Sequence, residues 1–587
     1  MVEGHLDPRE RVMACKGHAL FIGGPGSGKT TLALKKALAR IREGLVSGQT
    51  VLFLSFSRAA VTRVLDAAKL VVPRSELSLL SLQTFHSFFW MLLKTHAYLL
   101  GAPRKLSILL PQDEKALSGG IDEDEDGWAA WKNERDRLFW EEGRVAFDLF
   151  APNAAVLLEQ CAHILRNVAL SHPLIIVDEA QDTGENAWRC IKLLAPHTQV
   201  ICLADLEQQI FDFLPGVGPE RIQEIRAALE PLDVDLGNDN HRSPDTEILA
   251  FGNDVLTAKP RGAPYKGISC ITYGVGRSAP NWNHLLRWSL SVLHRDMRAD
   301  GKGPAKSVAI LTMGKGGALK VSNALNALGV NQGKSVRHKL LFDEAEALLT
   351  ARFAAFLLEP KHEAAMEMDV ATCMELLAAA RRATGTGKVA VEKLLEQAAK
   401  LRSGKALTIN LVKALRSVIS RICHEGFAGD PAADWLFVKH TLRATGQAEL
   451  TRAAMQLDFL VAFQRGHRIA AALSDEWLRD GAYTRARLAL DTALAQDQIL
   501  DGLEASPGLQ VMNIHKAKGK QFDGVILVRE LRHTGDRPES SFVWRGDVNP
   551  YPKSRRLVRV GATRARRRLL ILNPAWPACP VLRGHQL

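Results

Sequence analysis

The chain of 587 residues has no C-x-x-C pair of cysteines and no long apolar run. Its eight cysteines are scattered and several lie in apolar segments, which favours small buried side chains over zinc or iron–sulfur sites. No apolar stretch approaches the roughly 18 to 20 residues that span a bilayer. The first residues also lack the apolar core of a signal peptide. We therefore expect a cytoplasmic protein that does not enter membranes.

The chain does carry an excess of positive charge. Its 76 Lys and Arg residues outnumber 64 Asp and Glu residues, which gives a net charge of +12. An excess of this size suits a polyanionic partner, because neutralised phosphates drive nucleic-acid binding; a merely basic surface is the alternative. The hydrophobic content of 47% predicts a globular protein, and the length predicts about three to five domains or subdomains.

A glycine-rich loop near the N-terminus lies between an apolar segment and a helical pattern. Residues 23–30 fit the phosphate loop G-x-x-x-x-G-K-[ST], whose backbone amides and following helix cradle phosphates. Lys29 is expected to reach the β- and γ-phosphates of ATP, and Thr30 to bind Mg²⁺. The predicted nucleotide-binding residues of this segment are Gly23, Gly24, Pro25, Gly26, Ser27, Gly28, Lys29, Thr30 and Thr31.

Carboxylates follow a short apolar run at residues 174–182, which read Leu-Ile-Ile-Val-Asp-Glu-Ala-Gln-Asp. The run has the length and β-branched content of a buried parallel strand. Its acids would then lie at the C-terminal end of a strand, where open α/β sheets bind ligands. Together with the phosphate loop, this predicts that Asp178 holds the Mg²⁺ bound to Thr30. Glu179 would orient and deprotonate the water that attacks ATP.

Predicted strands form two series. Candidates at 51–56, 79–82, 174–178 and 199–205 alternate with helical patterns, and a second series lies at 269–273, 307–312, 509–514, 524–528 and 569–572. Two stretches, 91–170 and 345–500, interrupt these series with mainly helical sequence. The pattern predicts an α/β protein with two parallel sheets, each interrupted by an insertion.

Seven segments in order resemble the motifs of superfamily 1A DNA helicases of the UvrD/Rep/PcrA type. They are 55–60 (Ser-Phe-Ser-Arg-Ala-Ala), 84–88 (Thr-Phe-His-Ser-Phe), 178–182 (Asp-Glu-Ala-Gln-Asp), 204–211 (Ala-Asp-Leu-Glu-Gln-Gln-Ile-Phe), 240–243 (Asn-His-Arg-Ser), 515–522 (His-Lys-Ala-Lys-Gly-Lys-Gln-Phe) and 561–566 (Gly-Ala-Thr-Arg-Ala-Arg). One such match is weak, but seven in the family's order make an accidental match very improbable.

The resemblance implies two RecA-like P-loop domains that face each other across one ATP, each with a mainly helical inserted subdomain. The implied boundaries are 1–90 and 171–235 for domain 1A, 91–170 for insertion 1B, 236–354 and 501–587 for domain 2A, and 355–500 for insertion 2B.

The resemblance also implies roles for single residues. Gln208 would touch the attacking water or the γ-phosphate, and Arg242 and Arg564 would reach the γ-phosphate from the second domain. A guanidinium at that place stabilises charge in the transition state. Single-stranded DNA is gripped by stacking and phosphate contacts. The implied DNA contacts are Phe56, Arg58, His86, Phe213, His515 and Lys516.

Four positions depart from the family where it touches the base and sugar of ATP. Residues 6–11 contain no glutamine, Thr31 replaces an arginine, His241 a tyrosine and Gln521 a glutamate. His241 can still stack on a base and Gln521 can still accept a hydrogen bond, so both remain candidate nucleotide-binding residues. None of these positions touches the phosphates. We therefore hypothesise intact hydrolysis with weakened selection for adenine.

The expected function is that of an ATP-dependent, DNA-stimulated helicase or translocase that moves 3′ to 5′ and unwinds duplex DNA; the polarity comes from the resemblance alone. Its expected partners are single-stranded DNA and junctions of single- and double-stranded DNA. The alternative is a DNA-binding ATPase module of a phage-defence or repair complex. In that case a nuclease or repair factor would be its protein partner, and the chain would unwind little DNA by itself.

Overall fold

The computed structural model describes residues 8–586 except 25, 57, 120, 122–126, 206–219, 238–244, 275–280, 327–335, 342–344, 384–387, 460–466, 501–507, 519 and 535–536. The chain divides into two compact units. Unit 1 consists of Met1–Leu93, Ala151–Leu341 and Gly502–Leu587, and unit 2 of Lys94–Phe150 and Phe342–Asp501.

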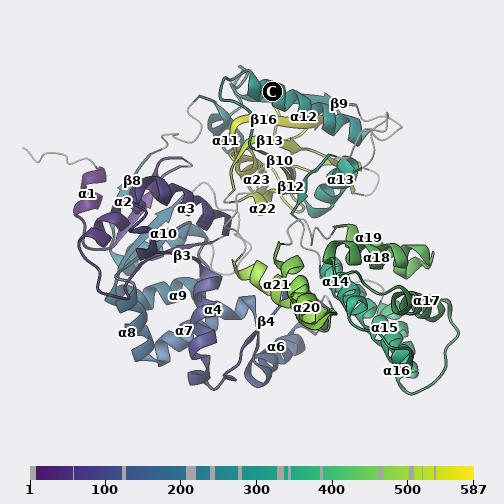
Figure 1. Cartoon of the computed structure of the whole chain (residues 1–587). Helices are drawn as coiled ribbons and strands as arrows, with labels where there is room; N and C mark the ends of the chain where they lie inside the picture. The colour runs from purple at the N-terminus through teal and green to yellow at the C-terminus, as the bar shows by residue number, and fades with distance from the viewer. Residues whose placement is uncertain are drawn as a thin grey trace, which may run out of the picture. The chain divides into compact units, whose positions relative to one another are not determined.

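The first sheet of unit 1 has six parallel strands in the order β3-β2-β6-β7-β1-β8. Its two edge strands, β3 and β8, are labelled in Figure 1. Every position of β2 and β6 is buried, as expected of parallel strands covered on both faces. The strands are β1 (Ala19–Ile22), β2 (Val51–Ser55), β3 (Leu80–Thr84), β6 (Leu174–Val177), β7 (Gln199–Ala204) and β8 (Leu232–Asp235). The helices are α1 (Pro8–Ala14), α2 (Lys29–Arg42), α3 (Arg58–Val71), α4 (Phe85–His96), α7 (Phe150–Gln160), α8 (Ala162–Ser171), α9 (Glu185–Leu194) and α10 (Glu220–Leu229). This sheet and its helices are called the first lobe.

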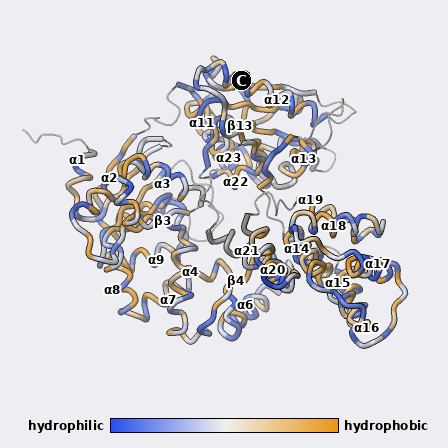
Figure 2. The backbone as a smooth tube through the Cα atoms, in the orientation of Figure 1, coloured by the Kyte–Doolittle hydropathy of each residue, from blue (hydrophilic) through white to orange (hydrophobic). Residues whose placement is uncertain are grey.

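The second sheet of unit 1 also has six parallel strands, in the order β11-β12-β10-β13-β16-β9. They are β9 (Ile268–Tyr273), β10 (Ser307–Thr312), β11 (Lys339–Leu340), β12 (Gly508–Asn513), β13 (Phe522–Val528) and β16 (Ala565–Pro574). The helices are α11 (Ile248–Thr257), α12 (Trp282–Arg298), α13 (Lys315–Asn326), α22 (Ile514–Ala517) and α23 (Pro552–Ala562), and a hairpin joins β14 (Leu531–Thr534) to β15 (Arg537–Ser540). This sheet and its helices are called the second lobe. Hydrophobic segments run through both sheets (Figure 2).

Unit 2 is mainly helical. Its helices are α5 (Pro111–Ser118), α6 (Trp128–Glu142), α14 (Ala345–Leu358), α15 (Met366–Arg382), α16 (Lys388–Arg402), α17 (Asn410–Glu425), α18 (Pro431–Ala444), α19 (Ala448–Phe459), α20 (His467–Asp480) and α21 (Ala486–Leu500). A short parallel pair joins β4 (Ser107–Leu109) to β5 (Arg144–Ala146). One apolar core runs through α14 to α21.

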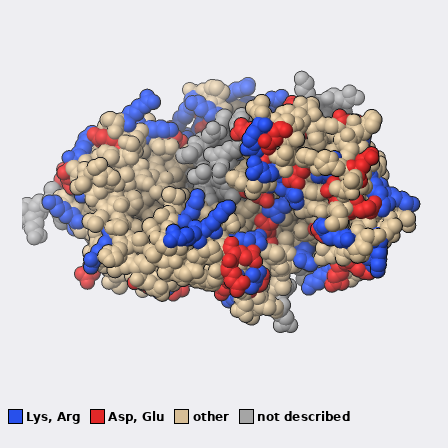
Figure 3. Space-filling model, turned by 60° about the horizontal axis from the view of Figure 1, so that its bottom comes forward, with Lys and Arg blue, Asp and Glu red and all other residues tan. Residues whose placement is uncertain are grey.

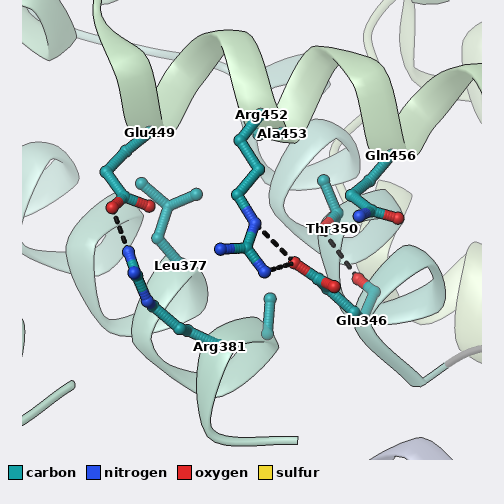
Figure 4. Close-up of a pocket in the computed structure, with 9 residues that line it drawn as sticks. Glu346, Thr350, Leu377, Arg381, Glu449, Arg452, Ala453 and Gln456 are labelled. Atoms are coloured by element: carbon teal, nitrogen blue, oxygen red, sulfur yellow. Dashed lines mark hydrogen bonds and ion pairs between the residues drawn. The ribbon is translucent and has the colours of Figure 1, made fainter. Parts of the chain in front are cut away.

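Ion pairs join α19 to α14 and α15 around a cavity of about 20 Å³ (Figure 4). Arg452 of α19 donates to Glu346 of α14 through Nε at 2.9 Å and Nη2 at 2.6 Å, and Arg381 of α15 pairs with Glu449 of α19. Both arginines already have carboxylate partners, and the cavity holds little more than a water molecule. These ion pairs therefore hold the three helices together.

The predicted fold class is confirmed: two parallel six-stranded sheets lie in one chain together with mainly helical segments. The predicted strands at 51–56, 174–178 and 199–205 correspond to β2, β6 and β7. The short pair β4–β5, the edge strands β8 and β11, and the hairpin β14–β15 were not predicted.

Two surface properties accompany this fold. Of the helices in the described ranges, none is both long and apolar enough to cross a membrane. Basic and acidic side chains are interspersed over the face drawn in Figure 3, so the net positive charge does not form a single stripe on that face.

Candidate nucleotide site

The register of the first lobe brings three strand ends to one edge of the sheet. Ile22 of β1 lies beside Ala204 of β7, and Val177 of β6 beside Cys202 of β7. The phosphate loop after β1, the acidic box after β6 and Asp205 after β7 therefore lie together. This is the edge at which parallel α/β sheets bind ligands.

The glycine-rich loop has the backbone shape that its sequence predicts. Gly26 and Gly28 have φ values of +90° and +92°, in the region that favours glycine. A Cβ at Gly23 would lie 2.6 Å from Ser27 Oγ, so the loop also has no room for a side chain there. Thr30 lies on the first turn of α2, and Thr31 beside it is exposed.

Lys29 points back into this loop. Its Nζ donates to the carbonyl oxygens of Gly23 at 2.5 Å and Gly24 at 3.0 Å, and lies 3.9 Å from Asp205 Oδ2. The ammonium is thus held between the loop and a carboxylate, at the place where the sequence predicts phosphate contacts.

The acidic box is buried beside the end of β2. The backbone N–H of Asp178 donates to Leu54 O at 2.8 Å, and Ser55 Oγ donates to Asp178 Oδ2 at 3.2 Å. Burial, and next to it the charge of Glu179, raise the pKa of Asp178 to about 6, against the opposing effects of Arg63 and Lys29. Burial also opposes ionisation of Glu179, but Lys518, the Gln181 amide and Lys29 outweigh it and lower the pKa of Glu179.

Glu179 has a strained backbone. Its φ of +53° and ψ of +43° place a non-glycine residue in the left-handed region. Such conformations concentrate at functional sites, where the surrounding structure holds them. Here the hydrogen bond from Gln181 Nε2 to Glu179 Oε2 at 2.7 Å fixes the carboxylate.

Gln181 links this carboxylate to the second lobe. Its Nε2 also donates to Asp182 Oδ2 at 3.1 Å, and its Oε1 accepts from the backbone N–H of Asp205 at 3.1 Å. Lys518, which follows α22 of the second lobe, donates from Nζ to the same Asp182 oxygen at 2.6 Å. Both partners of this ion pair are buried. Burial raises the pKa of Asp182 to about 7, while Lys518 opposes that rise.

Arg564 of the second lobe interacts electrostatically with this region. It is buried between α23 and β16, and its Nε donates to Val560 O at 2.9 Å. Burial, and next to it the charge of Arg63, lower the pKa of Arg564 to about 10, while Glu179 and Asp205 raise it. At neutral pH the guanidinium is therefore still charged, and it is close enough to feel both carboxylates.

Comparison with known proteins agrees with this geometry. Residues 6–135 and 122–225 match the model of the UvrD/REP helicase N-terminal domain. This part of the chain therefore resembles helicases of the UvrD/Rep/PcrA type. The chain is similar to the ATP-dependent DNA helicase PcrA of Staphylococcus aureus, with 25% identity over 302 residues, or 44% of this chain and 41% of that protein. DNA helicase II of Haemophilus influenzae is 25% identical over 289 residues, or 42% of this chain and 39% of the relative. The chain thus covers about two fifths of the length of these curated relatives.

The donors at this site suit the magnesium ion that the family implies. In the described ranges there is no cluster of three or more His, Cys, Asp or Glu side chains fit to hold a metal. Magnesium in nucleotide sites needs only one or two protein oxygens, because phosphate and water supply the others. The Asp178 carboxylate beside the Thr30 turn matches that smaller donor set.

Four residues implied by the family resemblance lie outside the described residues: Gln208, Phe213, His241 and Arg242. Pro25 of the phosphate loop lies outside them as well. Arg58 begins α3, but its side chain is not among those described. Their predicted roles stay predictions.

The remaining candidates are distributed over both lobes. Phe56 follows β2 and is half-buried, and His86 is exposed on the first turn of α4. His515 and Lys516 lie on α22. Burial, and next to it Lys518, lower the pKa of His515. Gln521 lies before β13, where its Oε1 accepts from Arg566 Nε at 3.1 Å.

Sequence reasoning missed four residues of this region. Lys518 and Gln181 lie inside the recognised motifs, but the sequence did not predict that both would bond to Asp182. Trp544 packs edge-on against His515 with ring centroids 5.4 Å apart, although 28 residues separate them in sequence, from 516 to 543. Arg63 belongs to no motif, and no local pattern distinguishes it from other helical arginines.

Proposed function

We propose that the chain hydrolyses ATP and uses the energy to move 3′ to 5′ along single-stranded DNA and to unwind duplex DNA. One observation carries the proposal: beside the phosphate loop, the acidic box of the first lobe contacts the second lobe through the buried pair of Lys518 and Asp182 at 2.6 Å. Such an arrangement can stabilise the charge that develops when a phosphoryl group is transferred.

In this proposal the first lobe binds the phosphates of ATP and activates the attacking water. Lys29 would exchange the carbonyl oxygens of Gly23 and Gly24 for phosphate oxygens. Thr30 and Asp178 would hold Mg²⁺, which when bound neutralises charge on the phosphates. Glu179, ionised and fixed by Gln181, would orient the water and accept its proton.

The second lobe would sense the nucleotide. Arg564 would approach the terminal phosphate, and Lys518 would remain attached to Asp182. Loss of the terminal phosphate then weakens the attraction between the lobes, which would tie hydrolysis to movement on DNA. Phe56 and His86 on the first lobe and His515 and Lys516 on the second would alternate as DNA contacts.

The first experiment measures ATP turnover of the full chain with and without single-stranded DNA. Lys29→Ala and Glu179→Gln should each lower turnover at least about 100-fold, because positioning and charge compensation supply most of the catalysis. Lys35→Ala, on the exposed side of α2, and Glu185→Gln, exposed at the start of α9, are matched controls. Strong hydrolysis by Glu179→Gln would contradict the assignment.

The second experiment measures strand separation on duplexes with a 3′ or a 5′ single-stranded tail. Unwinding of the 3′-tailed duplex alone supports the proposed polarity. ATP turnover without strand separation on either duplex would instead favour the ATPase module of a larger complex.

A further inference from the structure

Arg63 lies at the edge of the first sheet where the acidic box is formed. β2 pairs with β6 so that Leu54 lies beside Val177, and Ser55 at the end of β2 binds Asp178. Helix α3 begins at Arg58, immediately after this strand end, and Arg63 lies on its second turn. The helix thus carries a guanidinium next to the strand ends that hold the metal-binding and water-activating candidates.

The guanidinium of Arg63 is incompletely bonded. Its Nε is buried and has no hydrogen-bond partner within the part of the chain that the structure describes. A buried N–H without an acceptor costs free energy, and more so when the group is charged. The position is therefore one at which an incoming acceptor would be bound favourably.

The surrounding charges indicate what that acceptor is. Ser55, at the end of the strand that precedes α3, donates to Asp178 Oδ2 at 3.2 Å, and Gln181 donates to Glu179 Oε2 at 2.7 Å. The carboxylates assigned to the metal and the water therefore lie at the sheet edge where α3 begins. These groups would surround the terminal end of the phosphate chain. An anion with several oxygens at that place matches the planar fork of a guanidinium.

We propose that Arg63 is a further nucleotide-binding residue, which donates from its guanidinium to the terminal phosphate of a bound nucleoside triphosphate. This inference rests on the proposed function. It adds a second cation from the first lobe, beside Lys29, to the predicted phosphate contacts. Recognition of the triphosphate would then begin before the second lobe closes on the site.

The test compares binding of a non-hydrolysable ATP analogue with binding of ADP, using fluorescent derivatives of both and the full chain. Arg63→Met should weaken binding of the triphosphate analogue about tenfold or more, the usual effect of losing a charge-assisted hydrogen bond. Binding of ADP should change less than about threefold. Arg63→Gln keeps a hydrogen-bond donor without the charge, so its affinity for the triphosphate analogue should lie between those of the unmodified chain and Arg63→Met. This variant can also be measured if Arg63→Met does not fold.

Lys69→Met on the same helix is the matched control, because Lys69 is exposed and pairs only with Asp66 among the described residues. It should bind both nucleotides like the unmodified chain. If Arg63 only balances the charges of Asp178 and Glu179, the ratio of triphosphate to diphosphate affinity will stay at the value of the unmodified chain, and the inference is overturned. Equal weakening for both nucleotides also overturns it. An unmodified chain that binds neither nucleotide refutes the proposed function as well.

Discussion

Arg352 in unit 2 joins segments that are far apart in sequence. Arg352 lies on α14 and binds Asp113 of α5 through two hydrogen bonds. Its Nη2 donates to Asp113 Oδ2 at 2.9 Å, and its Nη1 donates to Oδ1 of the same carboxylate. It also donates from Nε at 3.0 Å and Nη2 at 2.8 Å to Asp491 of α21. Burial works against the charge of Arg352, but Asp113 and Asp491 outweigh it and raise its pKa. The triad therefore fastens α5 to the helical core of unit 2.

Arg352→Met should loosen this attachment. The substitution removes the cation that bonds both carboxylates, and removing one partner of a buried ion pair costs about 3–5 kcal/mol. The side chains of Arg352, Asp113 and Asp491 are 18%, 15% and 31% exposed, so water reduces the cost. We expect about 3 kcal/mol. Adding Asp113→Asn and Asp491→Asn should recover most of the loss, because no uncompensated charge then remains.

The loss should depend on pH. Burial and the charge of Asp113 already raise the pKa of Asp491 above the value of about 3.9 in the unfolded chain, and in Arg352→Met the opposing effect of the arginine is lost. Between that value and the raised pKa the folded state binds more protons than the unfolded state. Its stability therefore falls as the pH rises through this window. The difference between Arg352→Met and the unmodified chain should be larger at pH 8 than at pH 5.

Hydrogen exchange measures the effect locally, through the free energy of opening of amides in α5 and α14. The control is Arg402→Met, which removes a pair with Glu375 whose side chains are 39% and 37% exposed. Exposed pairs contribute about 0–1 kcal/mol, so the control should change little. Equal, small changes in both variants, or a pH-independent loss in Arg352→Met, would refute the reasoning.

Three further predictions concern the backbone and the nucleotide site. Gly143→Ala should lower the free energy of unfolding by about 2 kcal/mol or more, because φ is +69° and the new Cβ would lie 2.5 Å from Lys105 O. Gly101→Ala, with φ of +93° but open space, should cost only about 1 kcal/mol in the same thermal melts. Lys518→Met leaves Asp182 buried without its cation and should lower DNA-stimulated ATP turnover about tenfold or more, whereas the exposed Lys553→Met should not. Turnover of ATP, GTP and dATP should agree within about 100-fold, or about 2.7 kcal/mol; a stronger preference for ATP contradicts weakened adenine selection.

The parts of the site that are formed by short continuous segments could be predicted from the sequence. The strand Leu174–Val177 and the glycines at 26 and 28 follow from a short apolar run and a loop that needs positive φ. Their meeting at one sheet edge follows from the rule that parallel strands bind ligands at their C-terminal ends.

Long-range pairs could not be predicted in this way. Lys518 and Asp182 are 336 residues apart, and Arg352 and Asp113 are 239 residues apart. No periodicity within a helix or strand specifies such a partner. Arg63 was missed for a related reason, because its role depends on the direction of one side chain at the end of a neighbouring strand.

The charges around the site suggest how its two lobes could respond to ATP. In the described part of the first lobe, the four carboxylates Asp178, Glu179, Asp182 and Asp205 lie near the two cations Lys29 and Arg63. Lys518 and Arg564 supply cations from the second lobe. Opposite unit charges about 4 Å apart attract by about 4 kcal/mol at an effective dielectric constant of 20. A bound terminal phosphate would add negative charge between the lobes, and its departure would remove attraction of that order. Under the proposed function, hydrolysis therefore weakens the attraction between the lobes while the Lys518–Asp182 pair still joins them.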